Sequence, residues 1–208
     1  AEVGLVTPGG CIICGGGLVL FLDLGEHYLT DFVDSPSENH PKAPLNLALC
    51  TRCWLPQLEQ VVQRDVLFRN YHYLSGVNAS MRAHLEKLAK VVKKRLRPYD
   101  QIVDIGSNDG TFLKCFPEQF RYGFEPALNL LRNSWTTPPW PGCLAVVWPD
   151  YFSAVRYVAF AQTPADAVVS CAMFYDLLEP TKFALDIARV LARDGFWVCE
   201  MNYLGSML

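Results

Sequence analysis

Four cysteines near the start of the chain have the spacing of a metal site. They form two pairs, each with two intervening residues: Cys11 and Cys14 in CIIC, and Cys50 and Cys53 in CTRC. Each pair lets a tight turn present two thiolates to one side, and two such turns complete the tetrahedral sulfur set that zinc prefers. The 35 residues between the pairs exceed the usual spacing of a zinc ribbon, so disulfides or a redox role stay open as alternatives. The sequence favours zinc.

A site with four sulfur ligands has no open position for water, and it therefore holds structure without catalysing a reaction. Residues 1–70 contain few long periodic segments and many glycines and prolines, and a small lobe of this composition needs a metal ion or a disulfide to be stable. The nearby His27 and His40 are expected to lie in a polar loop, outside the metal site. We predict a zinc-binding lobe over residues 1–76 and a second domain over residues 77–208.

A second group of residues could bind a nucleoside. The stretch DIGSNDG contains Asp104, Gly106, Asn108, Asp109 and Gly110, and it follows an apolar run that is typical of a buried strand. Its glycines allow a tight turn and a close approach to a ligand, and we expect the loop to open a helix whose first amides are unpaired. The spacing is DxGxxxG, which differs from the GxGxxG of dinucleotide folds.

Two later strand ends add polar groups to this loop. Glu125 follows the next apolar run, where a carboxylate can accept both hydroxyl protons of a ribose. Asp150 follows a third run and can accept from an adenine amino group, while Tyr151 or Phe152 can lie against the ring. Each residue alone could be a simple cap or turn. In this order at successive strand ends, they indicate a nucleoside site.

The elements that must position these residues follow an alternating pattern. Residues 78–97 have apolar side chains at three- and four-residue steps, which predicts an amphipathic helix whose basic face is solvated. Another helix is expected from Pro180, ending at Gly195. The stretch NSWTTPPWPG is expected to be a surface loop. Five short apolar runs predict a parallel α/β sheet with helices on its faces: QIVDIG, YGFEP, LAVVW, ADAVVSC and GFWVCEM.

Composition narrows the class of protein. The chain has 208 residues, 51% of them hydrophobic, and its net charge of −3 makes nucleic acid an unlikely partner. Its longest apolar run is too short to span a bilayer, and its N-terminus lacks the basic start of a signal peptide. We expect an intracellular protein of the cytoplasm or an organellar matrix, without membrane partners. The other cysteines lie mostly in apolar stretches and are expected in the core: Cys115, Cys143, Cys171 and Cys199.

These motifs together resemble a known family. The order of the glycine loop, the ribose acid and the Asp-aromatic pair looks like a class I S-adenosylmethionine-dependent methyltransferase. The combination, which covers nearly the whole chain, resembles the zinc-containing C-methyltransferases that act on nucleotide-linked keto-deoxysugars. The motifs that carry this resemblance are the two CxxC pairs, YHYLSG, MRAHL, DIGSNDGTFL, GFEP, DYFS, AMFYDLLEP and EMNYLGSML.

The resemblance implies a class I methyltransferase (Rossmann-like) sheet and the cofactor S-adenosylmethionine. Gly106, Asn108, Asp109 and Gly110 would line its methionine end, Glu125 the ribose, and Asp150 with Tyr151 the adenine. In this family, a base removes a proton beside the sugar carbonyl, and the enolate carbon attacks the methyl group.

Two tyrosines match the family's active-site loop. The resemblance implies that Tyr71 or Tyr73 donates to the carbonyl or enolate oxygen. Packing between the lobe and the sheet is the alternative for both tyrosines. His84 could likewise be catalytic or could border the apolar stripe of its helix.

The chain departs from the family pattern at its C-terminus. The family continues into a His-Glu-His segment that is thought to supply the base, into two more strands and into a further domain, and these 208 residues stop before them. The sheet is therefore expected to be incomplete, with an edge strand near residues 196–201 that a protein partner would cover. A catalytically inactive scaffold subunit and a methyltransferase for another small molecule are the alternatives.

Overall fold

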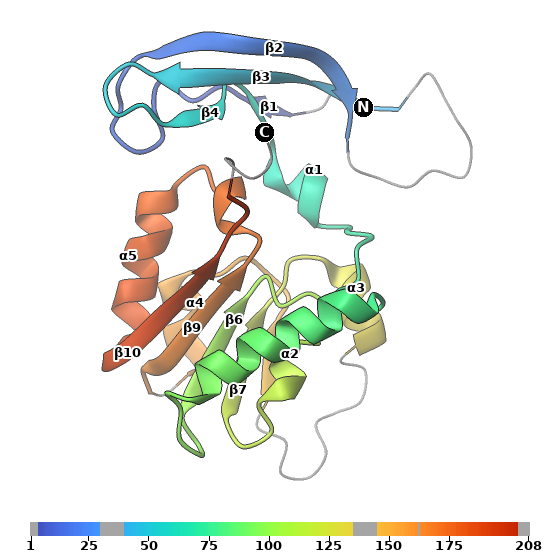
Figure 1. Ribbon diagram of the computed structural model, residues 1–208, viewed down its shortest axis with the longest axis vertical. Helices are drawn as coiled ribbons and strands as arrows, with labels where there is room; N and C mark the ends of the chain where they lie inside the picture. The colour runs from blue at the N-terminus through green and yellow to red at the C-terminus, as the bar shows by residue number, and fades with distance from the viewer. Residues whose placement is uncertain (1–3, 30–39, 135–144, 162, 204–208) are drawn as a thin grey trace. The chain divides into compact units, whose positions relative to one another are not determined.

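The computed structural model describes residues 4–29, 40–134, 145–161 and 163–203 (Figure 1). The chain divides into two compact units, Ala1–His72 with Leu178–Thr181 and Tyr73–Leu177 with Lys182–Leu208. No described helix combines the length and the apolar character needed to cross a membrane.

The first unit is built on a small antiparallel sheet. Strands β2 (Leu18–Tyr28), β3 (Lys42–Cys50) and β4 (Pro56–Leu58) lie in the order β2-β3-β4. Strand β1 (Leu5–Val6) pairs with β5 (Val61–Val62), and the short helix α1 (Arg64–Phe68) follows.

The placement of His27 in a polar loop is wrong. His27 lies in β2, and its Nε2 is 2.9 Å from the carbonyl oxygen of Leu24. The strand has apolar residues on both exposed faces, without the alternation of apolar and polar residues that predicts a strand from sequence.

The second unit contains the predicted parallel sheet. Its strands are β6 (Gln101–Ile105), β7 (Phe120–Phe124), β8 (Ala145–Trp148), β9 (Ala165–Cys171) and β10 (Leu191–Glu200). They lie in the order β10-β9-β6-β7-β8, and every pair is parallel. The strand order reverses beside β6, because β7 and β8 lie on one side of it and β9 and β10 on the other. All five carboxyl ends therefore meet at one edge, where parallel sheets bind ligands.

Helices cover both faces of this sheet. They are α2 (Ala79–Lys93), α3 (Leu128–Ser134), α4 (Ala154–Phe160) and α5 (Pro180–Val190), with two short 3-10 helices at Leu113–Cys115 and Phe174–Asp176. Asn78 caps α2, since its side chain accepts a hydrogen bond from the Ser80 amide. The helix ends at Lys93, four residues before the predicted end.

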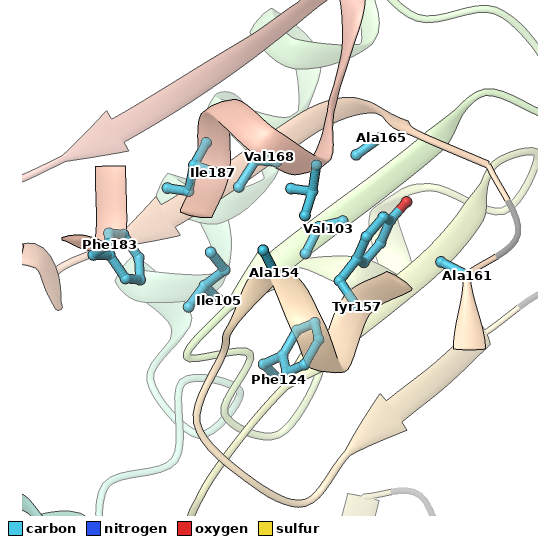
Figure 2. Packing of buried hydrophobic residues seen from close by; sticks show 11 residues of the cluster. Val103, Ile105, Phe124, Ala154, Tyr157, Ala161, Ala165, Val168, Phe183 and Ile187 are labelled. Carbon is cyan, nitrogen blue, oxygen red and sulfur yellow. The ribbon is translucent and has the colours of Figure 1, made fainter. Parts of the chain in front are cut away.

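The core has two halves, one on each face of the sheet. On one face, Leu85 and Val92 of α2 pack with Ile102 and Val169. On the other face, shown in Figure 2, residues of α4 and α5 surround Val103. Neighbouring residues of β6 and β9 thus belong to opposite halves, as the pleat of a strand requires. Burial on both faces explains why these strands are short continuous apolar runs.

Some local predictions differ from the structure. Helix α5 ends at Val190 and not at Gly195, which lies inside β10 where the pairing with β9 shifts. The loop after β6 leads into a single 3-10 turn, because Pro117 comes too soon for a longer helix. Most of NSWTTPPWPG lies outside the described residues.

The cysteines outside the two pairs are not all in the core. Cys199 is exposed, Cys115 and Cys171 are partly buried, and Cys143 lies outside the described residues. Cys199 belongs to β10, which is an edge strand as predicted. Within the described part of the chain, β10 pairs with β9 alone.

Candidate cofactor site and metal centre

The first unit brings the four paired cysteines together. Their Sγ atoms all lie within 4.8 Å of one another, with 3.5 Å between Cys11 and Cys53 and 3.5 Å between Cys14 and Cys50. Zinc–sulfur bonds of about 2.3 Å in a tetrahedron place the sulfurs roughly 3.8 Å apart. Four thiolates at these separations fit a zinc ion, and the chain supplies all four ligands of a closed, structural site.

Backbone amides of the second turn support the thiolate form. The amides of Cys53 and Arg52 both lie 3.4 Å from Cys50 Sγ. The Cys53 amide has the largest effect and, with the Arg52 amide, lowers the pKa of Cys50 to about 6 against the opposing effect of burial. Such hydrogen bonds orient sulfur ligands and stabilise their negative charge.

The glycine loop in the second unit joins the ends of β6 and β7. The amides of Gly106 and Ser107 both donate to the Phe124 carbonyl, at 2.8 and 3.1 Å. Gly106, Asn108 and Gly110 have φ angles of 76°, 50° and 73°, so the loop turns tightly through the left-handed region. The loop therefore lies directly beside the residue that follows β7.

That residue, Glu125, has both carboxylate oxygens oriented by backbone amides. Asn108 N donates to Oε2 and Ala127 N donates to Oε1, each at 2.8 Å. Glu125 is only 6% exposed, and burial raises its pKa although the two amides act in the opposite direction. Each oxygen has a second lone pair that can accept from a ligand hydroxyl.

Asp104 is the second-last residue of strand β6 and is 3% exposed. Burial, and secondarily the charge of Glu125, raise its pKa to about 8. Two nearby buried carboxyl groups thus lie at the carboxyl ends of neighbouring strands.

Asp150 and Tyr151 follow β8 at the same edge of the sheet. The amides of Glu125 and Asp150 both donate to the Trp148 carbonyl, which places the two residues side by side. Asp150 Oδ2 is paired with Arg156 at 2.7 Å, and Arg156 also donates to the Tyr151 carbonyl at 3.2 Å. The Asp150 carboxylate is thus held by an arginine that the sequence analysis did not single out.

The side chains of Asn108 and Asp109 contact the backbone of residues 73–76. Asn108 Oδ1 accepts from Ser75 N at 3.0 Å, and Asn108 Nδ2 donates to the Tyr73 carbonyl at 3.0 Å. Asp109 Oδ2 accepts from Gly76 N at 2.7 Å. The structure thus joins the tyrosine-bearing segment to the glycine loop.

The two predicted tyrosines belong to different units. Tyr73 lies in the second unit and is 39% exposed. Tyr71 lies in the first unit, where its ring is 5.9 Å from that of Phe68 and 5.5 Å from that of His72. Of the two, Tyr73 is the one whose backbone contacts the glycine loop.

A pair that the sequence analysis missed joins α2 to the end of β10. His84 Nε2 lies 2.8 Å from Glu200 Oε2 and 3.0 Å from Oε1. Glu200 also accepts, through its carbonyl, a hydrogen bond from Ala172 N, and Ala172 has a φ of 50° after β9. A signal for Glu200 was present, because it ends the fifth parallel strand just as Glu125 follows the second.

Comparison with known proteins relates both units to methyltransferases. Residues 11–68 match a family model described as a putative zinc binding domain. The chain is 30% identical over 174 residues to the C-methyltransferase NovU of Streptomyces niveus. The alignment covers 79% of this chain and 39% of NovU. It therefore spans about two fifths of the length of that relative.

Two of the solved structures that match this chain do so over little more than half of its length. The putative methyltransferase from an antibiotic biosynthesis pathway of Anabaena variabilis is 19% identical, with a TM-score of 0.42 over 54% of this chain and 44% of its own. Streptomyces venezuelae DesVI is 20% identical, with a TM-score of 0.44, and the match covers 59% of this chain and 51% of DesVI. Residues 11–68 therefore carry this zinc-binding domain, the second unit has the parallel sheet of the class I methyltransferase fold, and the chain is similar to a C-methyltransferase over 79% of its length.

Proposed function

We propose that the second unit binds S-adenosylmethionine and that the protein is a C-methyltransferase. The observation that carries this proposal is Glu125, a buried carboxylate whose two oxygens are fixed by amides beside a glycine loop. The name of the aligned relative, a C-methyltransferase, supports the same activity.

Residues at the ends of two strands, β7 and β8, divide the binding of the nucleoside between them. Glu125 accepts the two ribose hydroxyls through its outer lone pairs. Asp150, held by Arg156, accepts from the adenine amino group, and the half-buried Tyr151 lies beside it. The cofactor supplies a methyl group on a positively charged sulfur, which an electron-rich carbon of the acceptor attacks.

The acceptor that we propose is a nucleotide-linked keto-deoxysugar, in keeping with the resemblance of the motifs. A carbon nucleophile is formed there by removing a proton beside a carbonyl, which leaves negative charge on the carbonyl oxygen. A phenol hydroxyl can stabilise that charge, and Tyr73 or Tyr71 fills this role in the proposal. The zinc site takes no part in the reaction, because its four sulfurs leave no open position.

Calorimetry with S-adenosylhomocysteine tests the cofactor site. Replacing Glu125 by Gln removes one acceptor and the charge, and losing charged hydrogen bonds of roughly 1.5–3 kcal/mol weakens binding about 10- to 150-fold. Glu118→Gln is the matched control, because Glu118 is an exposed acid outside the site and its variant should bind like the wild type. Absence of binding heat for the wild type at millimolar ligand would instead favour a methyltransferase-like scaffold.

The acceptor is tested separately by proton exchange. In heavy water, a protein that also contains the family's His-Glu-His segment should introduce deuterium at the carbon beside the carbonyl of a nucleotide-linked keto-deoxysugar, even without cofactor turnover. S-Adenosylhomocysteine binding by that protein without such exchange would point to a different acceptor.

A further inference from the structure

The segment Tyr73–Gly76 is held by two side chains of the glycine loop. Asn108 contacts the segment twice, through Ser75 N and the Tyr73 carbonyl, both at 3.0 Å. Asp109 accepts from Gly76 N at 2.7 Å through one oxygen and from Thr111 N at 3.0 Å through the other. Three hydrogen bonds, to backbone groups of residues 73, 75 and 76, thus fix a stretch of four residues.

These contacts use the polar atoms of both side chains. Asn108 and Asp109 are 9% and 8% exposed, and each of their four side-chain polar atoms has a protein partner. Breaking such bonds leaves buried polar groups unsatisfied, which is more costly than the bonds' net contribution to stability. The two side chains therefore hold the protein's own backbone in place, and they do so without a ligand.

Asn108 also connects this segment to the carboxylate of Glu125. Its backbone amide donates to Glu125 Oε2 at 2.8 Å while its side chain bonds residues 73 and 75. The φ of 50° makes this double use geometrically feasible, and Asn is one of the few residues that tolerate it. A single residue thus lies between the ligand-accepting carboxylate and the tyrosine-bearing segment.

The segment approaches the loop too closely for a side chain at position 76. A Cβ added to Gly76 would lie 2.6 Å from Asp109 Oδ2 and 2.6 Å from Thr111 Oγ1. From α2, Arg82 Nη1 donates to the carbonyls of Gly76 and Val77 at 2.6 and 2.9 Å. The turn is therefore held by the glycine loop and by α2.

We propose that Asn108 and Asp109 are positioning residues, which fix the Tyr73–Gly76 backbone so that ligand binding at Glu125 restrains Tyr73. Asn108 transmits the restraint, because a ligand held by Glu125 also limits the movement of the amide that donates to it. The coupling to the ligand rests on the proposed function, whereas the hold on the segment exists without ligand. The inference gives Asn108 and Asp109 a different role from direct contact with the cofactor.

Amide hydrogen exchange, measured residue by residue on the full chain, tests the hold. Asn108→Gly removes only the side chain, since Gly keeps the left-handed backbone and the amide that donates to Glu125. Exchange at Ser75 should become about five- to tenfold faster, and Asp109→Ala should do the same at Gly76. The Gly110 amide, which donates to Ser107 at 2.9 Å, serves as the internal reference for the loop.

Asp166→Ala is the matched control. Asp166 Oδ2 accepts from Gln101 N at 2.7 Å, the same kind of bond as that of Asp109, but away from the segment. This variant should leave exchange at Ser75 and Gly76 unchanged. Equal acceleration at Gly110 in Asn108→Gly, or no acceleration at Ser75, would overturn the proposal.

Adding S-adenosylhomocysteine tests the coupling. Exchange at Ser75 and Gly76 should slow in the wild type and stay unchanged in Asn108→Gly, while the dissociation constant differs by less than about threefold between the two. An equal slowing in both proteins would refute the coupling, and so would a large loss of affinity, which would mean direct contact with the ligand. If the wild type does not bind the ligand, the proposed function fails, and the ligand-free exchange rates still decide whether the segment is held.

Discussion

Asp104 should make the second unit less stable as the pH rises, and Asp104→Asn should remove this effect. The carboxyl group is 3% exposed, and its pKa is raised from 3.8 to about 8, chiefly by burial and then by the charge of Glu125. Asparagine has nearly the same shape and carries no charge at any pH. The substitution therefore changes the ionisation while it changes the packing little.

The sign follows from proton binding in the two states. Below pH 3.8 both states carry the proton, so ionisation of Asp104 does not affect stability. Between pH 3.8 and about 8 the unfolded state gives up the proton while the folded state keeps it, and stability falls as the pH rises. Each pH unit is worth about 1.4 kcal/mol, so this residue should lower the free energy of unfolding by about 3 kcal/mol between pH 5 and pH 7.

Urea unfolding at pH 5 and pH 7, followed by far-UV circular dichroism, measures this difference. The variant should gain about 3 kcal/mol relative to the wild type on going from pH 5 to pH 7. Asp194→Asn is the control, because Asp194 is exposed in β10 and its contact with water changes little on unfolding. Protein from which zinc has not been removed should be used, so that the first unit stays folded at both pH values.

A parallel pH dependence in the wild type and Asp104→Asn would refute the reasoning. It would mean that the buried carboxyl group is already ionised at pH 5. In that case a nearby positive charge or hydrogen-bond donor must compensate for its burial.

Two other substitutions test the metal centre and the pair on β10. Cys50→Ser should abolish stoichiometric zinc binding in elemental analysis and unfold the first unit, while amides of β6 stay protected from exchange; retention of one zinc per chain would contradict the four-thiolate site. Glu200→Gln should cost less than about 1 kcal/mol in urea unfolding, because the His84 and Glu200 side chains are 48% and 34% exposed. A loss above about 2 kcal/mol would show that this pair stabilises more than an exposed ion pair does.

Much of the second unit could be predicted because its signals are local. The apolar runs of β6 and β9 are buried on both faces, and this double burial requires continuous apolar sequence. The amphipathic stripe of α2 and its Asn78 cap are likewise visible in the chain itself. Alternation of such strands and helices leaves few topologies other than a parallel sheet.

Other features were missed because distant residues decide them. The length of β2 depends on pairing with β3, since its own sequence has no alternating pattern and both its faces are exposed. Helix α5 ends before Gly195 because the following residues pair with β9. In both cases the pairing partner lies elsewhere in the chain, and strand formation depends on that context more than on local preference.

The sequence by itself determined the chemistry that each group can supply: four thiols paired for a metal, a glycine loop, and acids at successive strand ends. Only the tertiary structure decided what each group contacts. It placed Asp150 against Arg156, His84 against Glu200, and the side chains of Asn108 and Asp109 against the backbone of residues 73–76. Spacing along the chain limits which residue types share an edge of the sheet, whereas the direction of each side chain is set by backbone angles and packing from separate elements.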